Sequence, residues 1–456
     1  MSFPRYSKYK DSGIDWLGEV PTHWEVKRLR FVTALNPSKS EISDLDRSTL
    51  VSFLPMEAIG DDGLLSLEKE KSIRDLESGY TYFRDGDVVI AKITPCFENG
   101  KGALMHGLLN GIGFGSTELI VARPQPASLS GKFLHYLFIS YAFRHLGEAH
   151  MYGAGGQKRV PDAFVRDFTS SFPPVAEQID ITAFLDREIA KINALVAEQK
   201  RLIELLKEKR QAVISHAVTK GLNPDVPLKD SGVEWLGEVP THWEVRRIKH
   251  LARLIEQGWS PQCEGFPAEI DEWGVLKVGC VNGGTFNPLE NKLLPQEMEP
   301  IPALSIRSGD LLVSRANTRE LVGSAAVAEQ DYPKLMLCDK LYRIRLNQNL
   351  CWSKFVCCYL GADVARGQIE LAATGASSSM VNIGQSAIMD LVIAVPPLGE
   401  QGAIVSYLEY ERAKLDSLTA EAHRIIELLL ERRMALISAA VTGEIDVRAI
   451  ADRAAA

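Results

Sequence analysis

Two histidines and seven cysteines are the side chains best suited to catalysis or metal binding, and neither set has the spacing of such a site. The separation of His145 and His150 suits neither one helix face nor a pair of metal ligands. Solvent exposure or ordinary packing is the better interpretation of both. The cysteines form no CxxC pair and no Cys/His ligand pattern, so neither a zinc site nor a disulfide framework is predicted. We interpret them as reduced thiols; they are Cys96, Cys263, Cys280, Cys338, Cys351, Cys357 and Cys358.

Motifs that bind nucleotides or activate nucleophiles are missing from the sequence. The glycine-rich runs "GLLNGIGFGST" and "GAGGQKRV" lack the spacing of a GxxxxGK[ST] phosphate loop. There is no GxSxG, no HExxH, and no glycine-rich nucleotide fingerprint after a strand. The Asn-Pro-Pro or Asp-Pro-Pro plus aromatic pattern of amino-methyltransferases is also missing. The sequence therefore favours a binding module over an enzyme.

The composition is that of an ordinary soluble protein. The chain has 456 residues, of which 46% are hydrophobic and 24% charged, enough for two to four domains. It has no apolar run long enough to cross a bilayer and no apolar stretch typical of a signal peptide at its start. We expect a cytoplasmic protein. The net charge of −8 argues against general affinity for nucleic acid, although a local basic stripe is compatible with it.

An internal repeat organises the chain. "WLGEVPTHWEV" begins at Trp16 and again at Trp235, and residues 10–30 match residues 229–249 at 16 of 21 positions. A second block repeats from Phe172 and Val395, at an offset of 223. Between these blocks only anchors remain, such as "DGDVVIAKI" and "SGDLLVSRA", each a turn before an apolar run suited to a buried strand. The order is head, helix, head, helix.

Each second block is predicted to form one long helix. A Pro-Pro pair can lead into it, and Glu177 and Glu400 fall in the first turn, where a negative charge suits the helix dipole. The blocks run to Gly221 and Gly443, about 42 helical residues or roughly 60 Å each. We therefore expect a first head at 1–175, a first long helix at 176–219, a second head at 220–397, a second long helix at 398–442 and a tail at 443–456.

Apolar residues in these helices alternate at spacings of three and four, the seam of a coiled coil. Arg210 and Arg433 interrupt the seam at the same position of both copies, which can fix the register of two helices that pair. We expect antiparallel pairing that holds the heads apart; the alternative is a helix lying along its own domain. The seam comprises Leu185, Ile189, Ile192, Val196, Ile203, Leu206, Arg210, Val213, Leu408, Leu415, Ile426, Leu429, Arg433 and Leu436.

This plan resembles the specificity subunit of type I restriction-modification systems. The resemblance rests on the "GEVPTHW" start of each head, the "PPxxEQ" start of each helix, and the stretches "AKITPCFENGKGAL", "GSTELIVARP", "SRANTRELVG" and "SSSMVNIG". It covers essentially the whole chain. Single motifs are moderately specific, whereas their duplication in this order is very specific.

The resemblance implies a fold and a function. Each head would be an α/β (α+β) target recognition domain of mixed β-sheet and helices that reads one half of a bipartite, asymmetric site in double-stranded DNA. The paired helices would set the gap between half-sites and dock two modification subunits. Those subunits would bring S-adenosylmethionine for adenine methylation, and two restriction subunits would bring ATP- and Mg-dependent translocation and cleavage. This chain itself would be non-catalytic and hold no cofactor or metal.

Donor-rich loops of both heads are the candidate DNA-binding sites, because groove reading needs side chains with several donors and phosphate contacts need Lys, Arg, Ser or Thr. These residues cluster at matching places of the two heads but differ in type, so the half-sites should differ. The alternative interpretation of each residue is a loop side chain that faces solvent and makes no contact with DNA. In the first head they are Lys92, Thr94, Asn99, Lys101, Ser116, Thr117, Gln157, Lys158 and Arg159. In the second head they are Arg315, Asn317, Thr318, Arg319, Ser377, Ser378, Ser379 and Asn382.

Two rival functions belong to other classes. A coiled-coil interaction scaffold, whose heads bind protein, predicts no salt-dependent affinity for duplex DNA. A fused methyltransferase or nuclease predicts S-adenosylmethionine binding or catalysis by the isolated chain, and the missing motifs count against it.

Overall fold

Contacts between residues divide the chain into two units. The computed structural model describes residues 3–60, 63–154, 156–377 and 380–448. Unit 1 comprises Met1–Gln199 and His423–Ala456, and unit 2 comprises Lys200–Ala422. Each unit contains one head and a part of both long helices, α5 (Val175–Lys220) and α9 (Leu398–Thr442). The bounds of α5 exceed the expected ones by one residue at each end.

The head of unit 1 is built on two four-stranded sheets. Its strands are β1 (Tyr9–Asp11), β2 (Glu19–Pro21), β3 (Glu25–Arg28), β4 (Thr33–Leu35), β5 (Leu50–Leu54), β6 (Glu70–Ser72), β7 (Thr81–Arg84), β8 (Val88–Ala91), β9 (Gly102–Leu104), β10 (Ile112–Gly115), β11 (Leu119–Pro124) and β12 (Thr169–Phe172). One sheet has the order β6-β5-β10-β7, with β5 and β10 parallel, and the other is the antiparallel β4-β11-β8-β9. The helices are α1 (Ile73–Leu76), α2 (Gly131–Ile139), α3 (Tyr141–Ala149) and α4 (Asp162–Asp167).

The head of unit 2 repeats this plan with other residues. Its strands are β13 (Leu228–Asp230), β14 (Glu238–Pro240), β15 (Glu244–Arg247), β16 (Ala252–Gln257), β17 (Gly274–Leu276), β18 (Asn291–Leu293), β19 (Ser305–Ile306), β20 (Leu311–Ser314), β21 (Ala316–Asn317), β22 (Ala325–Val327), β23 (Tyr332–Met336), β24 (Leu341–Leu346), β25 (Thr374–Ser377), β26 (Met380–Asn382) and β27 (Val392–Val395). The helices are α6 (Ser353–Leu360), α7 (Asp363–Ala372) and α8 (Gln385–Asp390). The sheets β18-β17-β23-β19 and β16-β24-β20-β22 follow the same orders as in unit 1, again with one parallel pair, β17 and β23.

The two heads therefore have the same strand order, although their sequences between the repeated blocks differ at most positions. The buried strands β8 and β20, which the two aspartate-containing turns precede, are central in matching sheets. In both heads the strand after "THW" pairs antiparallel with the strand before the Pro-Pro pair, β3 with β12 and β15 with β27. This pairing brings the beginning and end of each head together at the start of its long helix.

The "EQ" pair of each PPxxEQ motif ties the long helix to its head. Gln178 is fully buried; its Oε1 accepts a hydrogen bond from Ser130 N (2.8 Å), and its Nε2 donates to Ser128 O (2.9 Å). Gln401, also fully buried, accepts a hydrogen bond from Trp352 N (2.8 Å). Because a buried amide must be satisfied, each glutamine fixes the segment that precedes a head helix against the long helix.

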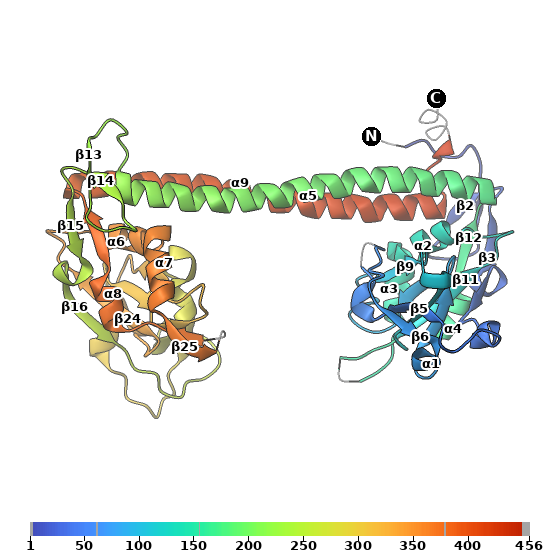
Figure 1. The fold of residues 1–456 in the computed structure, drawn as a ribbon, viewed down its shortest axis with the longest axis horizontal. Helices are drawn as coiled ribbons and strands as arrows, with labels where there is room; N and C mark the ends of the chain where they lie inside the picture. The colour runs from blue at the N-terminus through green and yellow to red at the C-terminus, as the bar shows by residue number, and fades with distance from the viewer. Residues whose placement is uncertain (1–2, 61–62, 155, 378–379, 449–456) are drawn as a thin grey trace. The chain divides into compact units, whose positions relative to one another are not determined.

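Segments of α5 and α9 pack against each other in each unit (Figure 1). Asn193 contacts Arg433, and Arg210 pairs with Asp416, so residue numbers rise along α5 as they fall along α9. The expected antiparallel pairing is confirmed. The predicted seam positions that are buried are Leu185, Ile192, Val196, Ile203, Leu206, Leu408, Leu415 and Leu436; those that are half-buried are Ile189, Arg210, Val213, Ile426, Leu429 and Arg433.

The two ends of α5 also enter head cores. Ile181 and Phe184 join Trp24 in the main core of unit 1, to which the end of α9 also contributes. Ala217 and Val218 join the main core of unit 2. The alternative of a helix along its own domain therefore describes only the ends of these helices, while the middle parts pair.

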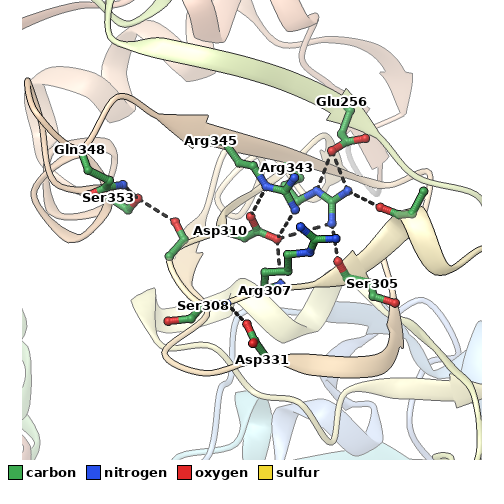
Figure 2. Close-up of polar contacts among 12 residues, drawn as sticks. Glu256, Ser305, Arg307, Ser308, Asp310, Asp331, Arg343, Arg345, Gln348 and Ser353 are labelled. Atoms are coloured by element: carbon green, nitrogen blue, oxygen red, sulfur yellow. Dashed lines mark hydrogen bonds and ion pairs between the residues drawn. The ribbon is translucent and has the colours of Figure 1, made fainter.

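A buried aspartate anchors the turn before the central strand in each head. In unit 1, Asp87 receives two hydrogen bonds from Arg123, of 2.6 and 2.8 Å. In unit 2, Asp310 lies between Arg343 and Arg345 (Figure 2), and Arg343 reaches Glu256 on its other side. Arg343 is 1% exposed. Because its buried charge is paired on both sides, removing either partner would leave an uncompensated charge inside the head.

Among the described residues, no helix is long and apolar enough to cross a membrane. Nor does any group of three or more His, Cys, Asp or Glu among them have the arrangement to hold a metal ion. All seven cysteines are free. Burial raises the pKa of the Cys338 and Cys351 thiols to about 12, so they are protonated at neutral pH.

Candidate nucleic-acid interface

Three predicted stretches of the first head meet around Lys92, the residue that follows β8. The backbone N of Lys92 donates to Glu118 O (2.8 Å), and its carbonyl accepts from Val160 N (2.8 Å). The turn at Ser116 and Thr117 and the loop that ends at Val160 therefore lie on either side of the Lys92 backbone. Ser116 Oγ accepts from Glu118 N (3.2 Å), which shapes that turn, and Thr117 is exposed.

Thr94 closes the glycine-rich loop onto this site. Its Oγ1 donates to Gly156 O (2.7 Å) and accepts from Lys158 N (3.1 Å), while its own N donates to Lys158 O (3.0 Å). Gly153 has φ +143, and a Cβ there would lie 2.4 Å from Gln157 O. Only glycine fits that close approach, so the glycines shape a loop whose tip exposes Gln157 and Lys158.

The charges of this site are unequal. Arg159 makes two hydrogen bonds of 2.8 Å to Glu118, and this guanidinium lowers the pKa of the Glu118 carboxyl. The ammonium groups of Lys92 and Lys158 make no ion pair with any described residue. The site thus contains three cationic residues and one carboxylate, which leaves an excess of positive charge suited to an anionic polymer. We name Lys92, Thr94, Glu118, Lys158 and Arg159 the head 1 cluster.

The second head repeats the backbone frame of this site around Arg315. The N of Arg315 donates to Lys340 O (2.8 Å), and its carbonyl accepts from Ile383 N (2.9 Å). These positions follow their counterparts in the first head at offsets of 222 or 223. The acid of the first head is replaced by Lys340, and the position of Arg159 is taken by Asn382. The same frame therefore presents different donors and acceptors in the two heads.

A three-stranded sheet, in the order β21-β26-β25, holds three of the other predicted residues of this head, Asn317, Ser377 and Asn382. Asn317 pairs with Val381 in it, and the Asn317 side chain accepts from Thr318 N (2.9 Å). Arg319 is exposed and donates to Glu370 O (3.2 Å). Ser377 ends β25, whereas Ser378 and Ser379 lie outside the described residues. We name Arg315, Asn317, Lys340 and Asn382 the head 2 cluster.

Two predicted residues of the first head lie apart from the head 1 cluster. Lys101 Nζ donates to Met56 O (3.0 Å), which is an internal bond of the head. Asn99 lines a cavity beside the helix pair, together with Arg144 and Arg433. The first part of the loop between β8 and β9 thus belongs to the head 1 cluster. Its last part, with Asn99 and Lys101, packs within the head and beside the long helices.

Sequence reasoning missed two arginines that hold these loops. Arg144 in α3 donates through Nη1 to Glu98 O (3.0 Å). Arg366 in α7, at an offset of 222, donates to Val322 O (2.5 Å) and Glu320 O (2.9 Å). Both arginines therefore clamp the loop that follows the central strand. Arg144 and Arg366 are 222 residues apart, close to the offset of the repeat, and this spacing was the signal available in the sequence. Glu118 and Lys340 are also 222 residues apart.

Comparisons with known proteins agree with this repeated architecture. The chain is 28% identical over 500 aligned positions to the type I restriction enzyme EcoEI specificity subunit of Escherichia coli, covering 93% of this chain and 83% of that protein. It is 45% identical over 162 residues to the EcoAI specificity subunit of Escherichia coli, covering 35% of this chain and 27% of that protein. No protein-family model matches the chain.

The proteins that this chain is similar to are thus specificity subunits of type I restriction enzymes. Two solved structures share the fold of this chain at 20% identity. A chain from a study of complex assembly and conformational transition of the type I R-M system has a TM-score of 0.72 and covers 92% of this chain and 98% of that one. The HsdS subunit from Thermoanaerobacter tengcongensis has a TM-score of 0.54, with 93% and 98% covered. The expected α/β fold with paired long helices is confirmed for this chain.

Proposed function

We propose that this chain is the DNA sequence-recognition subunit of a type I restriction-modification complex. Each head reads one half of a bipartite, asymmetric target, unit 1 through the head 1 cluster and unit 2 through the head 2 cluster. The helices α5 and α9 set the spacing of the half-sites and dock the modification subunits. Similarity to type I restriction enzyme specificity subunits over 93% of the chain supports the role, and the chain itself performs no catalysis.

One observation carries the assignment of the reading sites. The backbone frame around Lys92 recurs around Arg315, while the side chains on it change from Glu118 to Lys340 and from Arg159 to Asn382. Base edges in the major groove are distinguished by their donor and acceptor patterns, so a constant frame with exchanged donors and acceptors suits two different half-sites. The comparisons lend no support to a scaffold whose heads bind protein.

The partners and cofactors follow from the proposed role. We infer two modification subunits that bind S-adenosylmethionine and methylate adenine, and two restriction subunits that use ATP and Mg. Double-stranded DNA is the shared substrate, so we infer a cytoplasmic location. The acidic net charge of −8 leaves the free chain with weak, salt-sensitive DNA binding, and the modification subunits would complete the contact.

A head exchange tests the proposal. The chain is produced with its modification subunits, and methylated adenines are mapped by sequencing the DNA of the host. One bipartite sequence should be modified. Replacing residues 31–171 by the corresponding head of another specificity subunit should change one half-site and leave the other unchanged. A change in both halves, or in neither, would contradict the modular function.

A further inference from the structure

The seam arginines occupy equivalent places in the repeat but face different partners. In unit 2, Arg210 of α5 forms an ion pair with Asp416 of α9. In unit 1, Arg433 of α9 donates through Nη1 to Oδ1 of Asn193 in α5 (3.2 Å). Asn193 corresponds to Asp416, and Arg210 to Arg433, at the repeat offset of 223. The carboxylate that neutralises the arginine in unit 2 is therefore an amide in unit 1.

A second arginine faces the same place in unit 1. Arg144 and Arg433 both line a cavity of about 130 Å³, in which no lining residue is acidic. Burial, and then the charge of Arg433, lower the pKa of the Arg144 guanidinium. Glu148, four residues after Arg144, is exposed, and the Arg144 guanidinium donates instead to Glu98 O and Met434 Sδ. Two like charges thus share a cavity without a counter-charge, an arrangement that costs energy unless an anion enters.

Buried donors at this cavity have no partner. The Nε of Arg144 and the Nδ1 of His135, which also lines the cavity, form no hydrogen bond with any described residue. Burial lowers the pKa of His135 to about 4, so this imidazole is neutral at pH 7 and can still donate from one ring nitrogen. An unpaired buried donor destabilises the fold, and a hydrogen-bond acceptor in the cavity would remove that cost.

The corresponding cavity of unit 2 is balanced. It has a volume of about 480 Å³ and is lined by the equivalent arginines, Arg210 and Arg366, and by Arg412. Arg366 lies 3.6 Å from Glu370, and Arg210 pairs with Asp416. Further carboxylates line this cavity: Glu320, Asp363, Glu409 and Glu411. The excess of positive charge is therefore specific to unit 1.

We propose that the cavity of unit 1 binds a small oxyanion of the phosphate or sulfate class between Arg144 and Arg433. A tetrahedral oxyanion offers acceptors to both guanidinium groups, which match its geometry, and to Arg144 Nε. The cavity volume exceeds the space that a single water requires. The bound anion would connect Arg144 of α3 to Arg433 of α9. It would thus supply the negative charge that the carboxylate of Asp416 supplies to Arg210 in unit 2.

The test is thermal unfolding of the full-length chain in increasing phosphate, with sodium chloride adjusted to constant ionic strength. The Tm of the natural chain should rise and saturate. Asn193→Asp supplies the missing carboxylate, so it should raise Tm without phosphate and weaken the phosphate response at least tenfold. Asp416→Asn is the matched control in unit 2; it should lower Tm and leave the phosphate response in place. Hydrogen exchange should locate the phosphate-dependent protection in α3 and near Arg433.

Two results would overturn the oxyanion site. One is a Tm that phosphate does not change at constant ionic strength. The other is an equal phosphate response in the natural chain, Asn193→Asp and Arg433→Met, which would indicate the general stabilisation that phosphate gives any protein. Neither result bears on DNA recognition, because no DNA is present in the experiment.

Discussion

The indole N–H of Trp24 donates a hydrogen bond of 3.1 Å to Glu177 Oε1, and Trp243 repeats this bond to Glu400 at 3.2 Å. Both tryptophans are fully buried. The neighbouring histidine of each "THW" reaches the other carboxylate oxygen, His23 at 2.7 Å in unit 1. The glutamate in the first turn of each long helix thus accepts the hydrogen bonds of the repeated "THW" motif. This contact explains why the motif and the PPxxEQ start recur together.

Glu177→Gln should destabilise unit 1. The side chain keeps its size but loses the charge that strengthens its hydrogen bonds to Trp24 and His23, and such bonds contribute about 1.5–3 kcal/mol each. Glu400→Gln should cost less, because the Glu400 side chain is 28% exposed against 8% for Glu177. Urea unfolding followed by tryptophan fluorescence measures both. Glu198→Gln, at an exposed position of α5, is the control and should change the free energy of unfolding by less than about 0.5 kcal/mol. Equal midpoints for Glu177→Gln and Glu198→Gln would contradict the anchor.

Lys158→Ala should weaken DNA binding and its dependence on salt. The exposed ammonium of Lys158 has no partner among the described residues, so it is free to neutralise one phosphate. Loss of one such contact lowers the slope of log K against log salt by about 0.9. The measurement is a salt titration of the complex with the modification subunits on its methylated sequence. Lys191→Ala, which removes an ion pair of α5 with Glu188, should leave the slope unchanged. A slope that does not differ between these two variants would remove Lys158 from the interface.

Arg366→Gln should relax base discrimination at one half-site only. Arg366 holds the carbonyls of Glu320 and Val322, so its loss frees the loop that starts at Arg315. We expect discrimination between matched and single-mismatch targets to fall about 10-fold, or about 1.4 kcal/mol, at the half-site read by unit 2. Competition methylation assays measure it, with Arg432→Gln on the exposed face of α9 as the control. Loss at both half-sites would show that Arg366 acts on general stability.

Glu118→Gln should give a pH-dependent loss of stability. Arg159 lowers the pKa of Glu118 in the folded chain, so the ionised carboxylate stabilises the fold above its unfolded pKa of about 4.3. That contribution is lost as the pH falls through the lower folded-state pKa. The difference between the natural chain and Glu118→Gln should be constant from pH 7 to about 5, decline as the pH falls below about 4.3, and vanish only below the lowered folded-state pKa of Glu118. It should stay below about 1 kcal/mol at pH 7, because both side chains are partly exposed.

Urea unfolding across this pH range provides the measurement. Glu148→Gln, at an exposed position of α3 where the carboxylate forms no ion pair with any described residue, should show no such dependence. A difference that grows as the pH falls would have the wrong sign and would contradict the pairing of Glu118 with Arg159.

Local patterns were enough to predict the repeated frame. Apolar residues at spacings of three and four predict which face of each helix is buried, and the Pro-Pro pairs predict where α5 and α9 begin. Both features could be predicted because each depends only on residues that are close together in the sequence. The duplication itself identified two heads of one kind. It also located the stretches around Lys92 and Arg315, since each follows a buried strand that the two copies share.

The partners across the sheets were decided only by the tertiary structure. Lys92 meets Glu118 and Val160 through contacts between distant parts of the chain, and no local periodicity encodes such pairs. The same holds for Arg144, whose clamp on Glu98 separates Asn99 from the head 1 cluster. The sequence by itself determined that two heads share one frame. Folding decided which donors gather on that frame and which arginine lacks a carboxylate, because charges and hydrogen bonds are matched only when distant segments pack together.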